Sequence, residues 1–89
     1  MKFDEFLDEQ LKDPEFKKEW EEFQPELEIM KQIIGERIKQ NISQKELADR
    51  MGTKQANISK LENGEANPTL DFLKRLANSL GKKLEIKFV

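Results

Sequence analysis

The 89-residue sequence predicts an all-α fold, a bundle of about four to five helices followed by one short C-terminal β-strand. Three observations support this class. Across residues 26–81 apolar side chains recur at intervals of three and four, the period of an amphipathic helix. Capping residues and glycines divide that stretch into short segments. The last eight residues, KKLEIKFV, alternate apolar and polar side chains, as a strand does.

Two short amphipathic helices are expected within residues 1–25. The second begins at Asp13-Pro14, because Asp suits the N-cap position and Pro suits the first helical position. Pro25 predicts a boundary near Phe23-Gln24, since the residue before a proline is biased away from helix. Both segments carry large apolar side chains at helical spacing. These are Phe3, Phe6, Leu7, Phe16, Trp20 and Phe23.

A stronger helix is expected over residues 26–40. Its apolar stripe consists of Leu27, Met30, Ile34 and Ile38, with Ile33 beside it. After a break at Asn41-Ile42, Ser43 is a candidate N-cap, and Glu46 three residues later completes a capping box. The inner face of the helix that follows consists of Leu47, Ala48 and Met51, and Gly52 ends it.

Two further helices complete the predicted bundle. Thr53 is expected to cap the first of them, in which Ile58 and Leu61 face inward and which Asn63-Gly64 ends. Thr69 is expected to cap the last helix, which has the most apolar residues and should be the most buried. Gly81 follows it as a C′ glycine.

Residues 43–64, SQKELADRMGTKQANISKLENG, combine two short helices with a turn that contains glycine. This is the pattern of a helix-turn-helix, whose second helix enters the major groove of DNA. Ala48 is small where the two helices must cross closely, and Gly52 lies where the chain must turn. The plainer alternative is a helical hairpin without DNA binding.

The same stretch resembles the Cro/C1-type (XRE family) helix-turn-helix domain of phage repressors, over residues 27–81. Thr53 departs from the family pattern, where an aliphatic residue is more usual. The matching motifs are Ser43-Gln44, Glu46-Leu47-Ala48, Met51-Gly52, Ile58-Ser59-Lys60-Leu61-Glu62-Asn63-Gly64 and Asn67-Pro68-Thr69-Leu70.

The whole chain is similar to HigA-type antitoxins of HigBA toxin–antitoxin modules. The features that carry this resemblance are the leading LKDPEFKKEWEEFQPELEIMKQII, the helix-turn-helix and the terminal KLEIKF. The resemblance implies two activities: repression of the module's own operon, and neutralisation of a RelE/HigB-like toxin, a ribosome-dependent mRNA endonuclease. The main alternative is a stand-alone phage-type repressor, whose leader is a dimerisation or effector arm.

The repressor resemblance places the recognition helix near Thr53. Gln and Asn can bond adenine bidentately, Lys can bond guanine, and a small Ala can meet a thymine methyl group. Phosphate contact alone is the alternative for Lys54 and Lys60, and a helix cap is the alternative for Ser43. Glu62 is expected to be structural and to pair with a basic residue such as Arg50. The predicted DNA-binding residues are Ser43, Gln44, Lys54, Gln55, Ala56, Asn57, Lys60 and Asn63.

Charge divides the chain in two. Residues 1–30 hold 4 Lys/Arg against 11 Asp/Glu, whereas residues 31–89 hold 12 against 7. A basic half suits the phosphate backbone, and an acidic, aromatic-rich half suits a basic protein. Residues 1–25 are therefore the candidate toxin-binding segment, anchored by the six apolar residues named above. The alternatives are two solvated faces that attract each other, or aromatics that fold back onto the chain's own core.

One helix-turn-helix domain, here residues 26–81, reads only a few base pairs. We therefore expect a homodimer on a pseudo-palindromic operator, with half-sites about 34 Å apart. Residues 82–89 are the dimerisation candidate through Leu84, Ile86 and Phe88, because a lone strand needs a partner edge for its backbone. The alternative is that this strand completes the toxin's sheet.

The composition excludes several classes of function. The chain has no Cys and no His, which removes disulfides, zinc fingers and thiol or imidazole catalysis. It offers no nucleophile–base set, no phosphate-binding glycine loop and no spaced metal ligands, so we expect no enzyme and no cofactor. The N-terminus lacks an apolar run, and no later segment is long enough to span a membrane. These features favour a cytoplasmic protein.

Overall fold

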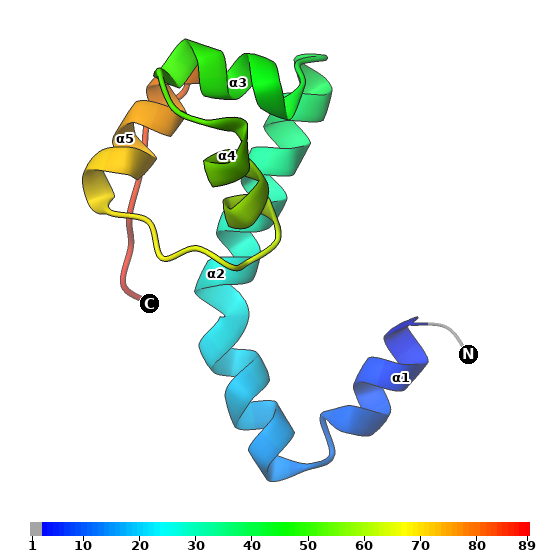
Figure 1. Cartoon of the computed structure of the whole chain (residues 1–89). Helices are drawn as coiled ribbons and strands as arrows, with labels where there is room; N and C mark the ends of the chain where they lie inside the picture. Colours follow the sequence, from blue (N-terminus) through cyan, green and yellow to red (C-terminus); the bar gives the residue numbers. More distant parts are fainter. Residues whose placement is uncertain (1–2) are drawn as a thin grey trace.

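The computed structural model describes residues 3–89 and contains five helices (Figure 1). The long helix α2 forms the axis of the molecule. Helices α3, α4 and α5 surround its C-terminal half, while α1 turns back beside its N-terminal half. The predicted helical bundle is confirmed. The helices are α1 (Phe3–Gln10), α2 (Pro14–Lys39), α3 (Gln44–Met51), α4 (Gln55–Glu62) and α5 (Leu70–Ser79).

The helix break predicted near Phe23-Gln24 is wrong, because α2 continues through Pro25. Packing on both sides of the proline explains this. A Cβ atom at Gly64 would lie 3.1 Å from the sulfur of Met30 and 3.8 Å from a ring carbon of Phe23. Both halves of α2 therefore meet the same loop, which offsets the single backbone hydrogen bond that an internal proline removes.

The core lies where α2, α3, α4 and α5 meet. The predicted inner faces of α3 and α4 are buried there, with Leu47 and Ile58 fully enclosed. The expectation for α5 is wrong, since only Leu76 within it is buried and Leu70 is half exposed. The buried apolar residues are Ile33, Ile42, Leu47, Ala48, Met51, Ile58, Leu61, Leu76 and Leu80.

Side-chain caps fix three helix starts. Asp13, Ser43 and Thr69 accept hydrogen bonds from the backbone N–H groups of Glu15, Glu46 and Phe72, at 3.0, 3.0 and 3.1 Å. Each satisfies a donor that the first helical turn leaves free. The predicted caps at Asp13, Ser43 and Thr69 are thereby confirmed.

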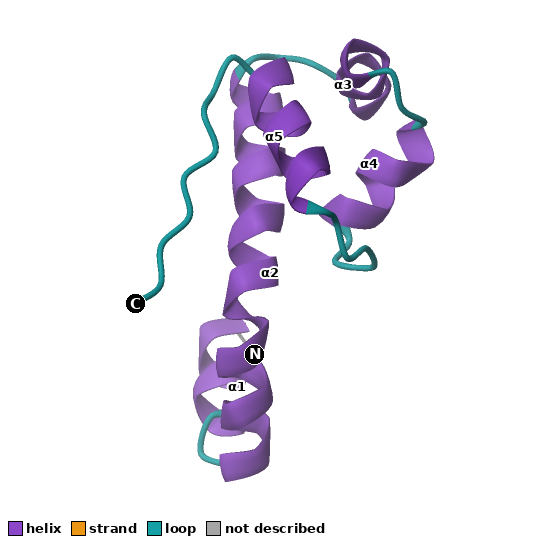
Figure 2. Cartoon of the chain, turned by 90° about the vertical axis from the view of Figure 1, so that its left-hand side faces the viewer, coloured by secondary structure: helices purple, strands orange, loops and turns teal. Residues whose placement is uncertain are grey.

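The C-terminal strand predicted over residues 82–89 is wrong for this chain, because residues 3–89 contain no strand. The tail instead runs beside α5 as an extended segment (Figure 2). Leu84 is half buried, whereas Ile86 and Phe88 are exposed. No second strand is available to the tail within the described chain, so its backbone N–H and C=O groups have no ladder to join.

Within residues 3–89, no helix combines the length and the apolar character needed to cross a bilayer.

Candidate nucleic-acid interface

The turn between α3 and α4 is built on Gly52. This residue has φ +70°, in the left-handed region where a glycine avoids the clash of a Cβ atom. The N–H of Thr53 then donates to the carbonyl oxygen of Ala48 at 2.9 Å, a Schellman-type closure of α3. This local geometry ends α3 sharply and sets the direction in which α4 starts.

Helix α4 presents one face to the core and one to solvent. Ile58 and Leu61 are buried against the rest of the bundle. The opposite face is exposed and carries donors, acceptors and positive charge on one short helix. Its exposed members are Lys54, Gln55, Ala56, Asn57 and Lys60. The structure thus brings five of the eight predicted DNA-binding residues onto one surface.

Thr53 does not cap α4 as expected. The N-cap position is occupied by Lys54, and no side chain caps the helix there. The hydroxyl of Thr53 instead accepts a hydrogen bond from Nδ2 of Asn57 at 2.8 Å. This bond orients the amide of Asn57 and leaves its Oδ1 and second N–H available to a ligand.

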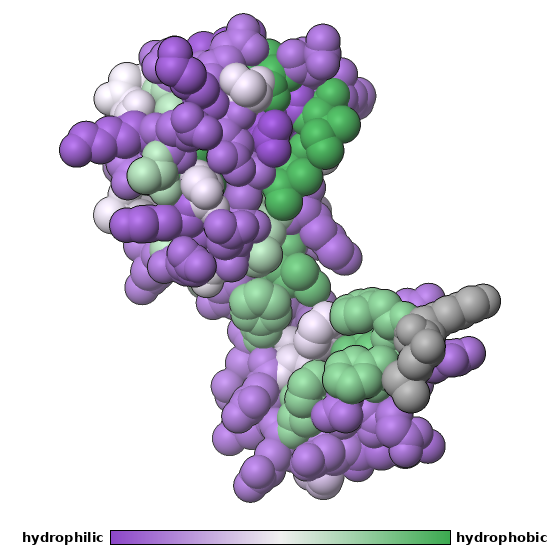
Figure 3. Space-filling view, turned by 45° about the vertical axis from the view of Figure 1, so that its right-hand side comes forward, coloured by the Kyte–Doolittle hydropathy of each residue, from purple (hydrophilic) through white to green (hydrophobic). Residues whose placement is uncertain are grey.

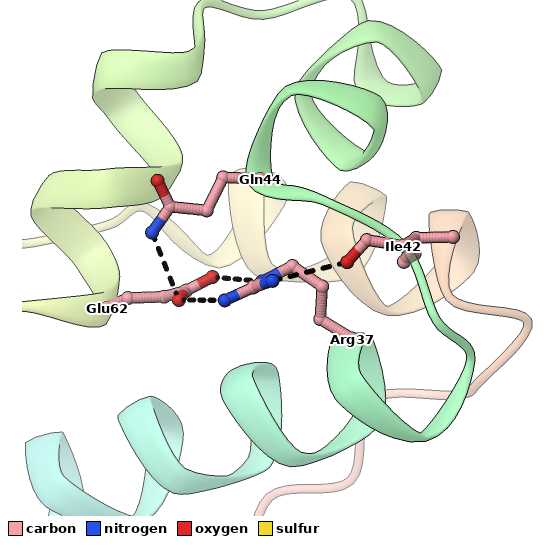
Figure 4. Close-up of polar contacts among 4 residues, drawn as sticks. All are labelled: Arg37, Ile42, Gln44 and Glu62. Carbon is pink, nitrogen blue, oxygen red and sulfur yellow. Dashed lines mark hydrogen bonds and ion pairs between the residues drawn. The ribbon is translucent and has the colours of Figure 1, made fainter.

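An ion pair between half-buried Arg37 and buried Glu62 joins α2 to the end of α4 (Figure 4). Arg37 donates from Nε and Nη2 to the two carboxylate oxygens of Glu62, both at 2.8 Å. Its Nη1 donates to the carbonyl oxygen of Ile42 at 3.2 Å, and Nε2 of Gln44 donates to Glu62 at 3.2 Å. The predicted partner of Glu62 is therefore wrong, since Arg50 lies beside Glu46 at 3.6 Å.

The electrostatics of this group follow from its geometry. The hydrogen bonds to Glu62 raise the pKa of Arg37 above its ordinary value, and the negative charge of Glu62 acts in the same direction, while burial opposes both. Glu62 is 5% exposed, and in the described chain no buried side-chain N or O lacks a partner. The charges are thus fully paired within the protein.

The remaining three predicted DNA-binding residues lie at adjacent helix ends. Ser43 is the exposed N-cap of α3, and Asn63 is the exposed C-cap of α4. Gln44 is half buried, and its bond to Glu62 brings the start of α3 next to the end of α4. One N–H of the Gln44 amide is thus engaged inside the protein. Its second N–H and the first backbone N–H groups of α3 are the donors left for a phosphate.

Arg37, which positions these elements, is absent from the site residues predicted from the sequence. The available signal was its spacing: Arg37 lies four residues after Ile33 on α2, and Glu62 directly follows Leu61 on α4. Opposite charges beside core positions predict a buried pair, because an unpaired charge there is costly.

The aromatic residues of the leader lie away from the core. Phe3 is 67% exposed and Phe6 48% exposed, Phe23 is also exposed, and Leu7, Phe16 and Trp20 are half buried. The core cluster contains none of the six. Apolar side chains instead gather on one face of α1 and α2, in a band that continues up α2 (Figure 3). The structure therefore gives no support to the alternative in which they fold back onto the core.

The fold and this exposed helix define a helix-turn-helix protein. A family model for helix-turn-helix domains matches residues 33–87. The chain belongs to this helix-turn-helix family, which confirms the Cro/C1-type domain implied by its motifs.

A relative in Haemophilus influenzae, named as an uncharacterized HTH-type transcriptional regulator, is 41% identical over 58 residues. The match covers 65% of this chain and 59% of the relative, so the chain spans about three fifths of that protein's length. No solved structure matches the chain.

Proposed function

We propose that this chain is a transcriptional regulator that binds operator DNA as a homodimer and reads bases with α4. The observation that carries the proposal is the exposed, amide- and lysine-bearing face of α4 on a helix whose other face is locked in the core. Gln55 and Asn57 supply bidentate donors and acceptors for adenine, and Lys54 and Lys60 supply donors for guanine or phosphate. The protein acts by binding and not by catalysis.

DNA selection from a random duplex pool tests this proposal. We expect one pseudo-palindromic motif to emerge. Gln55→Ala should weaken binding to that motif by about 1–3 kcal/mol, roughly 5- to 150-fold, because one bidentate base contact is lost. Binding to unrelated duplex should change much less, because it depends on phosphate contacts.

A matched control separates reading from folding. Gln32 lies exposed on α2 and bonds Glu28, far from α4 in the chain. Gln32→Ala should leave both affinities unchanged. The proposal fails if no motif is selected, or if Gln55→Ala and Gln32→Ala behave alike on the selected motif.

We further propose that the chain is the antitoxin of a HigB-like mRNA endonuclease, which the leader binds. Two features support this step. Residues 3–30 hold eleven Asp/Glu against three Lys, and large apolar side chains stay exposed among them. Aromatic anchors dominate binding energy at protein interfaces, and complementary charge speeds encounter. Covering the toxin's RNA-binding face, or preventing its fit on the ribosome, would neutralise it.

Purification of the tagged chain from its native cells tests the second step. We expect a small basic protein to copurify with the chain in stoichiometric amounts. That protein alone should block translation, and adding the chain should restore translation. Phe6→Gln should weaken the complex and leave the melting temperature unchanged, because Phe6 lies outside the core. Recovery of operator DNA with no protein partner would instead support the stand-alone regulator, which the name of the Haemophilus influenzae relative favours.

A further inference from the structure

Several large apolar side chains are exposed or half buried together on α1 and the N-terminal half of α2. We call this set the leader band. It consists of Phe3, Phe6 and Phe23, which are exposed, and Leu7, Phe16 and Trp20, which are half buried. Helix α1 contains no buried residue, and its apolar face is only partly covered within the chain, with Leu7 half buried. Figure 3 shows apolar side chains gathered on one face of these two helices.

The secondary structure of the band restricts what can cover it. Residues within α1 and α2 have their backbone N–H and C=O groups bonded inside the helices, so the band offers a ligand side chains and no strand edge. A segment that docks on it must satisfy its own backbone groups. An amphipathic helix does so and presents an apolar stripe at positions i, i+3, i+4 and i+7.

Charge decides which helix fits. Eleven carboxylates and three lysines surround the band within residues 3–30. A second copy of the chain would bring the same acidic surface against this one, and like charges across an interface oppose association. A helix whose polar flanks are lysine or arginine would be attracted and would lose little in desolvation at the exposed rim.

We propose that the leader band binds one amphipathic helix with basic flanks, which lies across α1 and the N-terminal half of α2. This inference rests on the proposed function in one respect, namely that the helix belongs to the basic protein partner. It adds the form of the recognised element. The partner contributes a helix, and not a sheet edge or an extended segment, to this surface.

Synthetic peptides test the proposal on the full chain. Three Trp-free peptides of about 18 residues, five helical turns, share one Leu stripe and differ only in having Lys, Gln or Glu on the flanks. The chain has a single tryptophan, Trp20 within the band, so its fluorescence reports binding directly. A fourth peptide has the composition of the Lys peptide with the Leu residues scattered around the helix.

We expect the Lys peptide to bind at least about tenfold more tightly than the Gln peptide at low salt, and the Glu peptide not to bind. The difference should shrink near 1 M salt, where the Debye length is about 3 Å. Circular dichroism should show that the bound Lys peptide is helical. The scattered peptide should bind at least about tenfold more weakly than the Lys peptide, because its apolar residues cannot face the band together.

Two variants locate the site. Phe6→Gln and Phe23→Gln should each weaken binding of the Lys peptide several-fold, whereas Gln32→Ala, at an exposed position of α2 outside the band, should not. Equal binding of the Lys and scattered peptides would overturn the proposal, because charge alone would then explain it. So would a bound peptide without helix, or a loss of dimer mass in Phe6→Gln, which would make the band an interface between two copies.

The outcome is separable from that of the proposed function. If the tagged chain yields no nuclease but the Lys peptide binds as described, the recognition mode stands with a different partner. If a nuclease is captured but the Lys peptide fails, the antitoxin proposal stands and the helix inference is wrong.

Discussion

Arg37 and Glu62 link three parts of the domain through four hydrogen bonds. The guanidinium reaches Glu62 on α4 and the carbonyl oxygen of Ile42 before α3, and Gln44 completes the group. Because the pKa of Arg37 is raised, its contribution to stability is fully present below the ordinary arginine pKa and is lost only as the pH rises through the raised value. Titration of Arg37 therefore does not change stability near neutral pH.

Removal of the Arg37 side chain should destabilise the protein strongly. Arg37→Ala leaves the carboxylate of Glu62 buried without its partner, and breaking a buried pair in this way costs about 3–5 kcal/mol. That is a large part of the roughly 5–15 kcal/mol by which a small domain is stable. Urea unfolding followed by circular dichroism measures the change. Arg37→Lys should lose less, since it keeps the charge but cannot hold both oxygens.

An exposed ion pair provides the control for this prediction. Arg50 and Glu46 lie one turn apart on α3, and both side chains are at least two fifths exposed. Arg50→Ala should cost no more than about 0.5 kcal/mol. Equal losses from Arg37→Ala and Arg50→Ala would show that burial of the first pair does not matter. If Arg37→Ala fails to fold, the same comparison is made with Arg37→Lys.

At the scale of elements, two glycines make opposite demands on the backbone. Gly35 lies exposed inside α2 with no atom within 4 Å of an added Cβ, whereas Gly52 lies at φ +70° after α3. Gly35→Ala should stabilise the protein by about 0.5–1 kcal/mol, because alanine favours a helix interior. Gly52→Ala should destabilise it by about 1–2 kcal/mol, because a Cβ atom strains the left-handed conformation.

Thermal and urea unfolding of the two glycine variants give the comparison directly. Their difference isolates backbone conformation, since neither new methyl group meets a neighbour. A destabilised Gly35→Ala would show that α2 does not need to be helical at that point. An unchanged Gly52→Ala would show that the turn before α4 is not tightly set.

Elements whose cause is local could be predicted from the sequence. Ser43 and Thr69 act through backbone groups three residues away, and Gly52 acts through its own φ angle. The role of each residue could therefore be predicted from its neighbours in the sequence. The helix break predicted from Pro25 was wrong because a loop at Gly64, distant in the sequence, packs against both halves of α2. The strand predicted for residues 82–89 was wrong because alternating apolar and polar residues are not enough to form one. A strand also needs a neighbouring strand, which the described chain does not supply.

The candidate site divides in the same way. The exposed face of α4 followed from the positions of Ile58 and Leu61, which fix the opposite side of a helix by its period. The partner of Glu62 could not be found by period, because Arg37 lies 25 residues earlier and on another helix. Only the packing of α2 against α4 brings the two side chains together.

At the scale of the whole molecule, residues 3–89 expose apolar side chains in regions of different chemistry. One is the acidic leader band on α1 and α2. Another lies on α5 and the tail, where Leu70, Ile86 and Phe88 are exposed and several lysines are close by. Figure 1 shows α1 and the tail on different sides of α2. The proposed protein partner and a second copy of the chain would therefore meet different surfaces, and the homodimer proposal places the second copy on α5 and the tail.

Deletion of residues 83–89 tests this assignment. The truncated chain should keep its helical content, because the core is formed by residues 33–80. Its sedimentation mass should fall to about half, since Ile86 and Phe88 would no longer bury apolar surface against a second copy. Operator affinity should fall with it, because two half-sites about 34 Å apart need two linked domains.

Glu85→Gln, which keeps the apolar residues of the tail, should remain dimeric. A truncated chain that stays dimeric would show that the dimer forms elsewhere, and Leu70 with Ile38, 65% exposed on α2, would then be the next positions to substitute.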